Sequence, residues 1–327
     1  MRNIIIVGQG AIGLLWYHHI LQMINNHGDY NKARLHLLPS KRTDSTSPSA
    51  KPGSNKTSTN QVTISYDQYS FTDHNALVHQ GKINYAQTED IEQADLIIFC
   101  VKAFQISLAL SNIASKLKSN IDIVLAHNGM GTLPELSQDV IKHQNIYALL
   151  TTHGCLRSAP FTVTHTGVGS TDIGLLSGVP NLAQQESLTK LLNAALPQVT
   201  SHQEINQKQW LKLAINCVIN PLTAINDISN GEINNAEYSS TILILLEEVV
   251  AVADAEKVNL DLADLKIIVK NVAQATAKNS SSMRCDITAQ RMSEIDYING
   301  YIHRLGIKHK IATPENTKMW QAVSALS

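Results

Sequence analysis

The sequence lacks several features that would assign it to a common class of protein. Its four cysteines form no Cys-x-x-Cys pair and its thirteen histidines form no His-Glu-x-x-His motif, so we expect neither a metal site nor a redox dithiol. No apolar run approaches the roughly 18 residues of a membrane-spanning helix, and no basic segment precedes an apolar core near residue 1. The formal net charge of −1 offers no general attraction to nucleic acid or to an anionic membrane. We therefore expect a cytoplasmic protein whose partner is a small molecule, with a homodimer as an open alternative to a monomer.

The length and the hydrophobic content predict two domains. A chain of 327 residues with 43% hydrophobic residues exceeds one ordinary core and suits domains of roughly 100–200 residues. The first half alternates short β-branched runs with helical patterns, as parallel βαβ units do, and the pattern becomes helical from about Gln207. We predict an α/β protein with an N-terminal Rossmann-type, doubly wound parallel sheet over residues 1–203 and an all-helical C-terminal domain over 204–327. Residues 43–60, which are mostly Ser, Thr, Pro, Gly and Lys, are predicted to form a mobile surface loop.

The positions of individual elements follow from short-range patterns. Residues 161–176 alternate β-formers with turn glycines, which predicts antiparallel strands that close the first domain. The long apolar run 242–258 is predicted to be the central buried helix of the second domain, followed by helical segments at 262–277 and 287–309. Apolar or β-branched runs predict parallel strands at residues 3–7, 34–38, 94–101, 122–126 and 146–152.

A glycine motif follows the first predicted strand. Gly8-x-Gly10-x-x-Gly13 alone is a weak signal, but here apolar residues precede it as a strand and an apolar helical pattern follows it. In that setting the first glycine permits a tight turn, the second lets a pyrophosphate approach the backbone, and the third lets the helix pack closely on the strand. The motif therefore predicts a dinucleotide site on the helix N-terminus, and a glycine-rich turn without a ligand is the alternative. The predicted cofactor contacts in this turn are Gly8, Gln9, Gly10, Ala11, Ile12 and Gly13.

The residues after the second predicted strand indicate which dinucleotide binds. A carboxylate at that point would hold the ribose 2′-hydroxyl of NAD. The chain has none there, and Ser40, Lys41 and Arg42 offer a hydroxyl and two cations instead. These residues favour a 2′-phosphate and hence NADP(H), unless Lys41 and Arg42 only lead into a solvated loop. Two more polar segments, Lys102 and His127-Asn128-Gly129, follow strands at the carboxyl edge where such a sheet binds ligands.

The second half carries polar residues at helical spacing. Lys212, Asn216 and Asn220 step by four, so they lie along one face of a helix whose other residues are largely apolar. Buried polar groups need partners, and a polar substrate can supply them. An exposed polar stripe without a ligand remains the alternative on spacing alone.

A second polar segment runs from residue 279 to residue 300. Ser282 is expected to cap a helix and, with Asn279, to offer donors to a carboxylate. Glu294 is expected to lie within an amphipathic helix, where it is either a site residue or a surface ion-pair partner of Arg291.

Taken together, these segments resemble the ketopantoate 2-reductase family, which reduces ketopantoate with NADPH in pantothenate biosynthesis. Two of the strings are specific: Asn128-Gly-Met-Gly131 and Asn216-Cys-Val-Ile-Asn-Pro-Leu-Thr-Ala224. The resemblance covers nearly the whole chain and also includes Gly8-Gln-Gly-Ala-Ile-Gly13, Val101-Lys-Ala-Phe-Gln105, Thr152-His-Gly154, His165-Thr-Gly167, Asn279 to Met283 and Glu294-Ile-Asp-Tyr-Ile-Asn-Gly300.

The resemblance implies roles for individual residues. Lys212 matches the catalytic lysine of the family and Glu294 its active-site glutamate, which also lies next to the cofactor. The residues that match substrate contacts are Asn128, Asn216, Asn220, Asn279 and Ser282, and Lys102 and Asn128 match residues beside the nicotinamide. In this chemistry charge builds on the carbonyl oxygen, where Lys212 can donate a proton. Two alternatives stay open: an NADP-dependent reductase of another small 2-keto acid, and a non-catalytic NADP-binding sensor.

Overall fold

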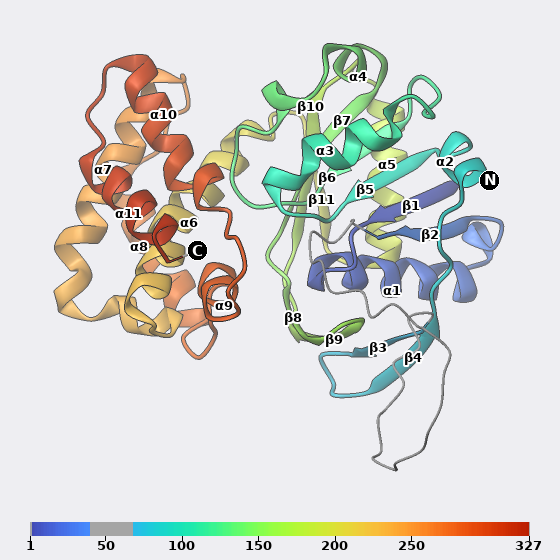
Figure 1. The fold of residues 1–327 in the computed structure, drawn as a ribbon, viewed down its shortest axis with the longest axis horizontal. Helices are drawn as coiled ribbons and strands as arrows, with labels where there is room; N and C mark the ends of the chain where they lie inside the picture. The colour runs from blue at the N-terminus through green and yellow to red at the C-terminus, as the bar shows by residue number, and fades with distance from the viewer. Residues whose placement is uncertain (1, 40–67, 327) are drawn as a thin grey trace, which may run out of the picture.

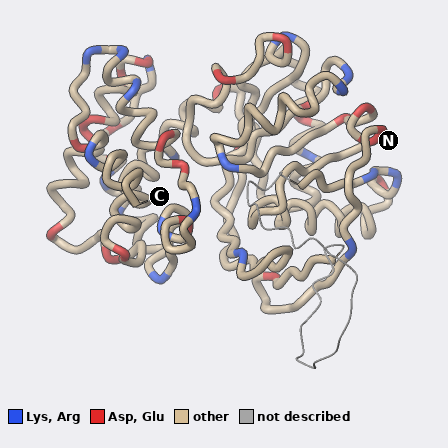
Figure 2. Tube along the Cα trace, in the orientation of Figure 1, with Lys and Arg blue, Asp and Glu red and all other residues tan. Residues whose placement is uncertain are grey.

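The computed structural model describes residues 2–39 and 68–326, which form two domains that lie side by side (Figure 1). One domain contains all the strands of the described residues, and the other contains helices only. Ser40, Lys41, Arg42 and the predicted loop 43–60 lie outside the described residues. Figure 2 shows basic and acidic residues interspersed over both domains.

The larger sheet of the first domain positions the glycine motif at the carboxyl end of β1, next to the edge strand β2. Its strands are β1 (Asn3–Val7), β2 (Arg34–Leu38), β5 (Leu96–Phe99), β6 (Asp122–Leu125), β7 (Asn145–Thr151), β10 (Thr171–Ser177) and β11 (Val199–His202). Within the described residues they lie in the order β11-β10-β7-β6-β5-β1-β2, and every pair is parallel except β7 with β10. The chain runs outward in both directions from β1, so the end of β1 is the switch point where such sheets bind ligands. The doubly wound sheet predicted from the sequence is thus confirmed.

Helices cover both faces of this sheet because its strands are apolar on both sides. All five residues of β1 are buried, and alternate side chains enter different cores. Ile4 and Ile6 pack on the face covered by α1 (Ala11–Asn26) and α5 (Leu182–Ala195), whereas Ile5 and Val7 pack on the opposite face. The opposite face is covered by α2 (Thr88–Glu92), α3 (Ala103–Ala114) and α4 (Gln138–His143). Short 3-10 turns lie at η1 (Gly28–Tyr30) and η2 (Leu133–Glu135).

A smaller sheet packs against the far side of α1. It consists of β4 (Val78–Lys82), β3 (Gln68–Thr72), β9 (Thr162–Gly167) and β8 (Gly154–Ala159), in that spatial order. The ring of His18 on α1 stacks on Phe71 of β3 with centroids 4.0 Å apart. The antiparallel strands predicted within 161–176 are confirmed, but they belong to different sheets: β9 pairs with β8, and β10 pairs with β7.

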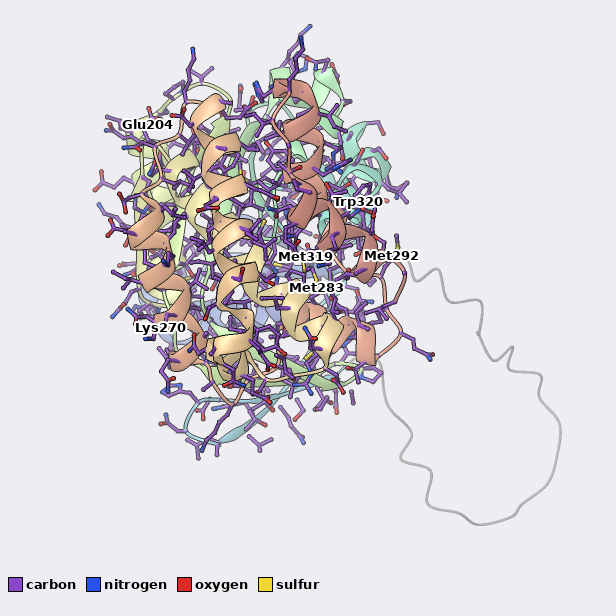
Figure 3. All side chains as sticks on the ribbon, turned by 90° about the vertical axis from the view of Figure 1, so that its left-hand side faces the viewer. Glu204, Lys270, Met283, Met292, Met319 and Trp320 are labelled. Atoms are coloured by element: carbon purple, nitrogen blue, oxygen red, sulfur yellow. The ribbon has the colours of Figure 1, made fainter. Side chains whose placement is uncertain are left out.

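The second domain is helical, as predicted. Its α-helices are α6 (Asn206–Asn226), α7 (Ser239–Ala255), α8 (Leu262–Ala275), α9 (Ser282–Thr288), α10 (Asn299–His309) and α11 (Pro314–Ser324), joined by the 3-10 turns η3 (Asn230–Asn234), η4 (Ala236–Tyr238) and η5 (Ile295–Tyr297). Figure 3 looks onto this domain: Met283 and Met319 lie among the helices, and Glu204 and Lys270 lie at its outer edge. None of the helices within residues 2–39 and 68–326 is long and apolar enough to cross a membrane.

The prediction that residues 242–258 form the central helix was wrong. That segment is mostly α7, which leaves one side to solvent, with Ile244 39% exposed. The central position belongs to α6, which packs against α7, α8, α9 and α11 and in which every residue from Cys217 to Ala224 is buried. The polar residues of α6 are largely shielded from solvent: Lys212 contacts the end of β7 in the other domain, and Asn220 is buried.

Candidate active site

The glycine motif forms a close-packed turn between β1 and α1. Gly8 has φ +107°, and a Cβ on Gly13 would lie 2.0 Å from the carbonyl oxygen of Gly8, so neither position accepts a side chain without a shift in the backbone. Helix α1 starts with Gly10 as its N-cap and has no side-chain cap. Its first backbone N–H groups therefore point outward without a partner inside the helix, as a bound pyrophosphate requires. The turn fits a dinucleotide at the switch point of the sheet.

Lys102 follows β5 and connects the two domains. It is the N-cap residue of α3, and its ammonium group bonds the carboxylate of Asp286 on α9 of the helical domain. The same nitrogen lies 3.7 Å from Oε2 of Glu294. Burial alone would lower the pKa of Lys102, but Glu294 and Asp286 outweigh it and raise that pKa. The lysine is therefore a permanent cation beside the dinucleotide turn. α9 lies on the side of its domain that faces the sheets (Figure 1).

Glu294 is buried, so the alternative of a surface ion pair does not hold, and its expected place within a helix was wrong. It lies in the loop before η5 rather than within a helix, and it is 5% exposed. Arg291 pairs instead with Asp286, at 3.3 Å. Helix α9 ends early because Gln290 adopts φ +51° and Arg291 donates its N–H back to the carbonyl of Asp286. A glutamine in this left-handed position leaves no sequence signal of the kind that glycine leaves.

The carboxylate of Glu294 binds two segments of the sheet domain. Its Oε1 accepts the backbone N–H of Ala103, in the first turn of α3, at 2.9 Å. Its Oε2 accepts the side-chain amide of Asn128 at 3.3 Å. The structure therefore brings together Lys102, Asn128 and Glu294, which the sequence places far apart.

The polar row of α6 lies where its spacing predicts. Nζ of Lys212 donates to the backbone carbonyl of Thr151, at the end of β7, over 2.8 Å. Burial lowers the pKa of Lys212 to about 8, while the charges of Glu294 and Asp172 oppose that shift. One turn further on, the amide nitrogen of Asn216 is buried and has no hydrogen-bond partner among the described residues. Asn220 is buried one turn beyond it. A buried donor without a partner is what a substrate oxygen would satisfy.

Ser282 is not the helix cap that we expected. The cap of α9 is Ser281, whose hydroxyl accepts the N–H of Arg284 at 3.0 Å. The sequence alone does not distinguish Ser280, Ser281 and Ser282 as caps. In the structure Ser281 has an additional partner in Thr223 of α6, whose hydroxyl donates to it at 2.7 Å. Ser282 is the exposed first residue of α9. Asn279 is also exposed, and its carbonyl accepts the N–H of Asn230.

Sequence reasoning assigned no role to two residues of this region. Asp286 is 6% exposed and holds Lys102, yet in the sequence it is one acidic residue among several. His127 lines a small cavity with Lys212, and only its place at the end of a predicted strand pointed to it. The other residues around that cavity are Gly129, Leu150, Gln209 and Leu213. In the part of the chain that the structure describes, no group of three or more His, Cys, Asp and Glu side chains is arranged to hold a metal ion.

Two family models match the chain and together cover most of it. Residues 4–178 match the model described as ketopantoate reductase PanE/ApbA, and residues 204–327 match the C-terminal model of the same family. Both halves of the site, the glycine turn and the polar row of α6, fall within these matches.

Individual relatives agree with the family models. A 2-dehydropantoate 2-reductase of Vibrio cholerae is 34% identical over 99% of this chain and 97% of its own. The enzyme of the same name from Shigella flexneri is 41% identical over 70% of this chain and 73% of its own.

Solved structures share the fold at lower identity. A D-mandelate dehydrogenase in a ternary complex with NADH and anilino(oxo)acetate has a TM-score of 0.82 at 21% identity, covering 100% of this chain and 98% of its own. A PanE/ApbA family ketopantoate reductase from Ralstonia eutropha has a TM-score of 0.78 at 22% identity over the same shares. At this identity the likeness concerns the arrangement of the two domains.

Proposed function

The chain belongs to the ketopantoate reductase family, and from that premise we propose that it reduces ketopantoate (2-dehydropantoate) to pantoate with NADPH, as a step of pantothenate and coenzyme A biosynthesis. The observation that carries the proposal is the buried row of α6. Lys212 and the unpartnered amide of Asn216 lie on one face of this helix, and Lys212 contacts the end of the parallel sheet. A proton donor and a free amide donor suit an oxygen-rich substrate.

The sheet domain would hold the cofactor. The turn from Gly8 to Gly13 and the N-terminus of α1 suit the pyrophosphate, and Lys102 lies at the end of the neighbouring strand β5. NADPH, when bound there, supplies the hydride. The protein has to place the substrate carbonyl and supply the proton.

Lys212 would donate that proton. As the substrate carbonyl is reduced, negative charge builds on its oxygen, and a positioned acid stabilises it. With a pKa of about 8, the ammonium group is protonated at pH 7. Because this pKa is close to neutral pH, the group also releases its proton readily. Such a group typically contributes ~10²–10⁴-fold to the rate. The bond to Thr151 fixes the ammonium group at the sheet edge.

The remaining polar residues would orient the substrate. The amides of Asn216, Asn220 and Asn128 are suited to its oxygens. Ser282 and Asn279, both exposed, can offer donors to its carboxylate at the entrance. Glu294, already bound to Asn128, can accept a hydrogen bond from a substrate hydroxyl.

A spectrophotometric assay tests the reaction. Purified protein is mixed with ketopantoate and NADPH, and absorbance at 340 nm is followed. We expect consumption that Lys212→Ala abolishes and that Lys270→Ala, an exposed lysine of α8, leaves unchanged. Tight NADPH binding without turnover would show a non-catalytic binding protein, and faster turnover of another 2-keto acid would reassign the substrate.

Cofactor choice is a separate part of the proposal. Ser40, Lys41 and Arg42 follow β2 closely in the sequence, and we propose that they bind the 2′-phosphate of NADPH. The relevant measurement is the ratio of kcat/KM for NADPH to that for NADH. The double substitution Lys41→Ala, Arg42→Ala should lower this ratio chiefly by raising KM for NADPH. An unchanged ratio, or a preference for NADH in the natural chain, would contradict it.

We also propose that the enzyme works in the cytoplasm. Its assembly is open to direct measurement, since one structural relative is a dimeric ketopantoate reductase from Staphylococcus aureus, with a TM-score of 0.76 at 20% identity. Sedimentation equilibrium distinguishes a monomer from a homodimer.

A further inference from the structure

The ring of His127 closes the loop that carries Asn128. His127 lies two residues after the end of β6, and its Nδ1 lies 3.0 Å from the backbone carbonyl oxygen of Asn128. Its Nε2 lies 3.0 Å from the hydroxyl of Thr132, at the other end of the loop. One half-buried imidazole thus joins both ends of a loop of the candidate active site.

The two partners determine the tautomer of this ring. A carbonyl oxygen can only accept, so Nδ1 must carry the hydrogen and donate it to Asn128. In the neutral ring Nε2 is then an acceptor, and the Thr132 hydroxyl donates to it. Burial lowers the pKa of His127. The Asn128 carbonyl, Glu294 and Glu135 oppose that shift, and Lys212 adds to it. The ring therefore stays neutral at neutral pH.

The middle of the loop from His127 to Thr132 packs closely against the helical domain. Gly129 has φ +81°, and a Cβ there would lie 2.3 Å from the carbonyl oxygen of Tyr297 in η5. Met130 donates its N–H to that same oxygen at 2.8 Å. These contacts restrict the conformation of the loop between its two ends. A shift of the Asn128 peptide would therefore also move the Asn128 side chain.

That side chain is the one that reaches Glu294. The Asn128 amide donates to Oε2 of Glu294 at 3.3 Å, and His127 itself lines the cavity that contains Lys212. We propose that His127 is a positioning residue: as the Nδ1–H tautomer it fixes the Asn128 peptide, and so aims the Asn128 amide at Glu294 and at the reacting end of the substrate. The substrate part of this inference rests on the proposed function above.

Three substitutions test the roles of the two ring nitrogen atoms separately. Asparagine places its amide nitrogen near the position of Nδ1, so His127→Asn retains the donor to Asn128. Glutamine reaches the position of Nε2, so His127→Gln retains only the contact with Thr132, and His127→Leu removes both. Misplacing a reacting group by about 1 Å can cost about 10²-fold in rate. We expect kcat to fall by about 10- to 100-fold in the Gln and Leu variants and to be largely restored in the Asn variant. Thr132→Val, which spares Nδ1, should cost less than His127→Leu.

The controls separate positioning from folding and from cofactor binding. Melting temperatures and the Kd for NADPH, measured by fluorescence, should stay close to those of the natural chain in the Asn and Gln variants. If His127→Leu does not fold, the comparison of Asn with Gln still decides. Equal kcat in these two variants, whether both are retained or both lost, would overturn the positioning role. A natural chain that does not reduce ketopantoate at all would instead overturn the proposed function.

Discussion

Nζ of Lys212 donates to the backbone carbonyl of Thr151 over 2.8 Å, and this bond joins the central helix of one domain to the sheet of the other. The lysine is therefore held in a buried position where the free energy of its charged form depends on a few neighbours. Glu294 and Asp172 stabilise the charge, and burial opposes it. Its ionisation should consequently be visible in the kinetics.

The first prediction is a loss of activity at alkaline pH. Proton donation requires the ammonium form of Lys212, which is present below a pKa of about 8 and is lost as the pH rises through that value. A profile of kcat/KM for ketopantoate from pH 6 to 10 should fall above about pH 8. A profile that stays flat to pH 10 would contradict the role of Lys212 as the acid.

Neutralising Glu294 should shift the pH at which kcat/KM falls. The charge of Glu294 raises the pKa of Lys212, so Glu294→Gln should shift the fall in kcat/KM to lower pH. The glutamine oxygen can still accept the N–H of Ala103, which keeps the loop in place. Glu135→Gln is the matched control, because Glu135 bonds the hydroxyl of Tyr297 and is not among the groups that shift Lys212. If both variants shift the fall in kcat/KM by the same amount, the charge of Glu294 is not the cause of the shift.

A methyl group at Gly13 should disrupt the dinucleotide turn. The new Cβ would lie 2.0 Å from the carbonyl oxygen of Gly8, so the helix and the strand must separate. Overpacking of this kind typically costs about 1–3 kcal/mol. Urea unfolding should show that loss for Gly13→Ala, and fluorescence should show weaker NADPH binding. Gly28→Ala is the control, since nothing lies within 4 Å of its added Cβ. Equal stability of the two variants would contradict the prediction.

Removing Lys102 should destabilise the contact between the domains. Lys102→Met leaves the buried Oδ2 of Asp286 without its basic partner, while Arg291 still bonds Oδ1. An unsatisfied buried polar group typically costs about 1–3 kcal/mol, measurable as a lower urea midpoint. Lys118→Met removes a more exposed pair with Asp95, for which at most about 1 kcal/mol is expected. The prediction fails if Lys118→Met costs as much.

Glu248 should matter for the fold of the helical domain. Its carboxylate accepts the backbone N–H groups of Glu315 and Asn316 at the start of α11, each at 2.8 Å. Glu248→Ala leaves these donors without their partner and should cost about 1–3 kcal/mol of unfolding free energy. Glu247→Ala, on the exposed side of α7, should change it by no more than about 0.5 kcal/mol.

Much of the fold was accessible from the sequence because its signals are local. The strand 34–38 was located to the residue, since β2 is bounded by the same positions. The spacing of Lys212, Asn216 and Asn220 was enough to align them on α6, because a helix converts a step of four into one face.

The parts that were mistaken depend on contacts between distant segments. Ser281 rather than Ser282 caps α9 because Thr223 selects it. Glu294 leaves the helix because Gln290 adopts a left-handed conformation and because Ala103 supplies a donor for its carboxylate. Asp286 acquires its partner only when α9 meets α3. No pattern within the segment 279–300 contains this information.

The contacts of Lys102 and Glu294 have a consequence for how tightly ligands bind. Both residues connect the two domains, and both belong to the candidate site. A ligand in the site would therefore contact residues that also hold the two domains together. We expect a ligand that strengthens this contact between the domains to make the next ligand bind more tightly. By thermodynamic reciprocity, the factor by which a dinucleotide increases the affinity for the keto acid equals the factor by which the keto acid increases the affinity for the dinucleotide.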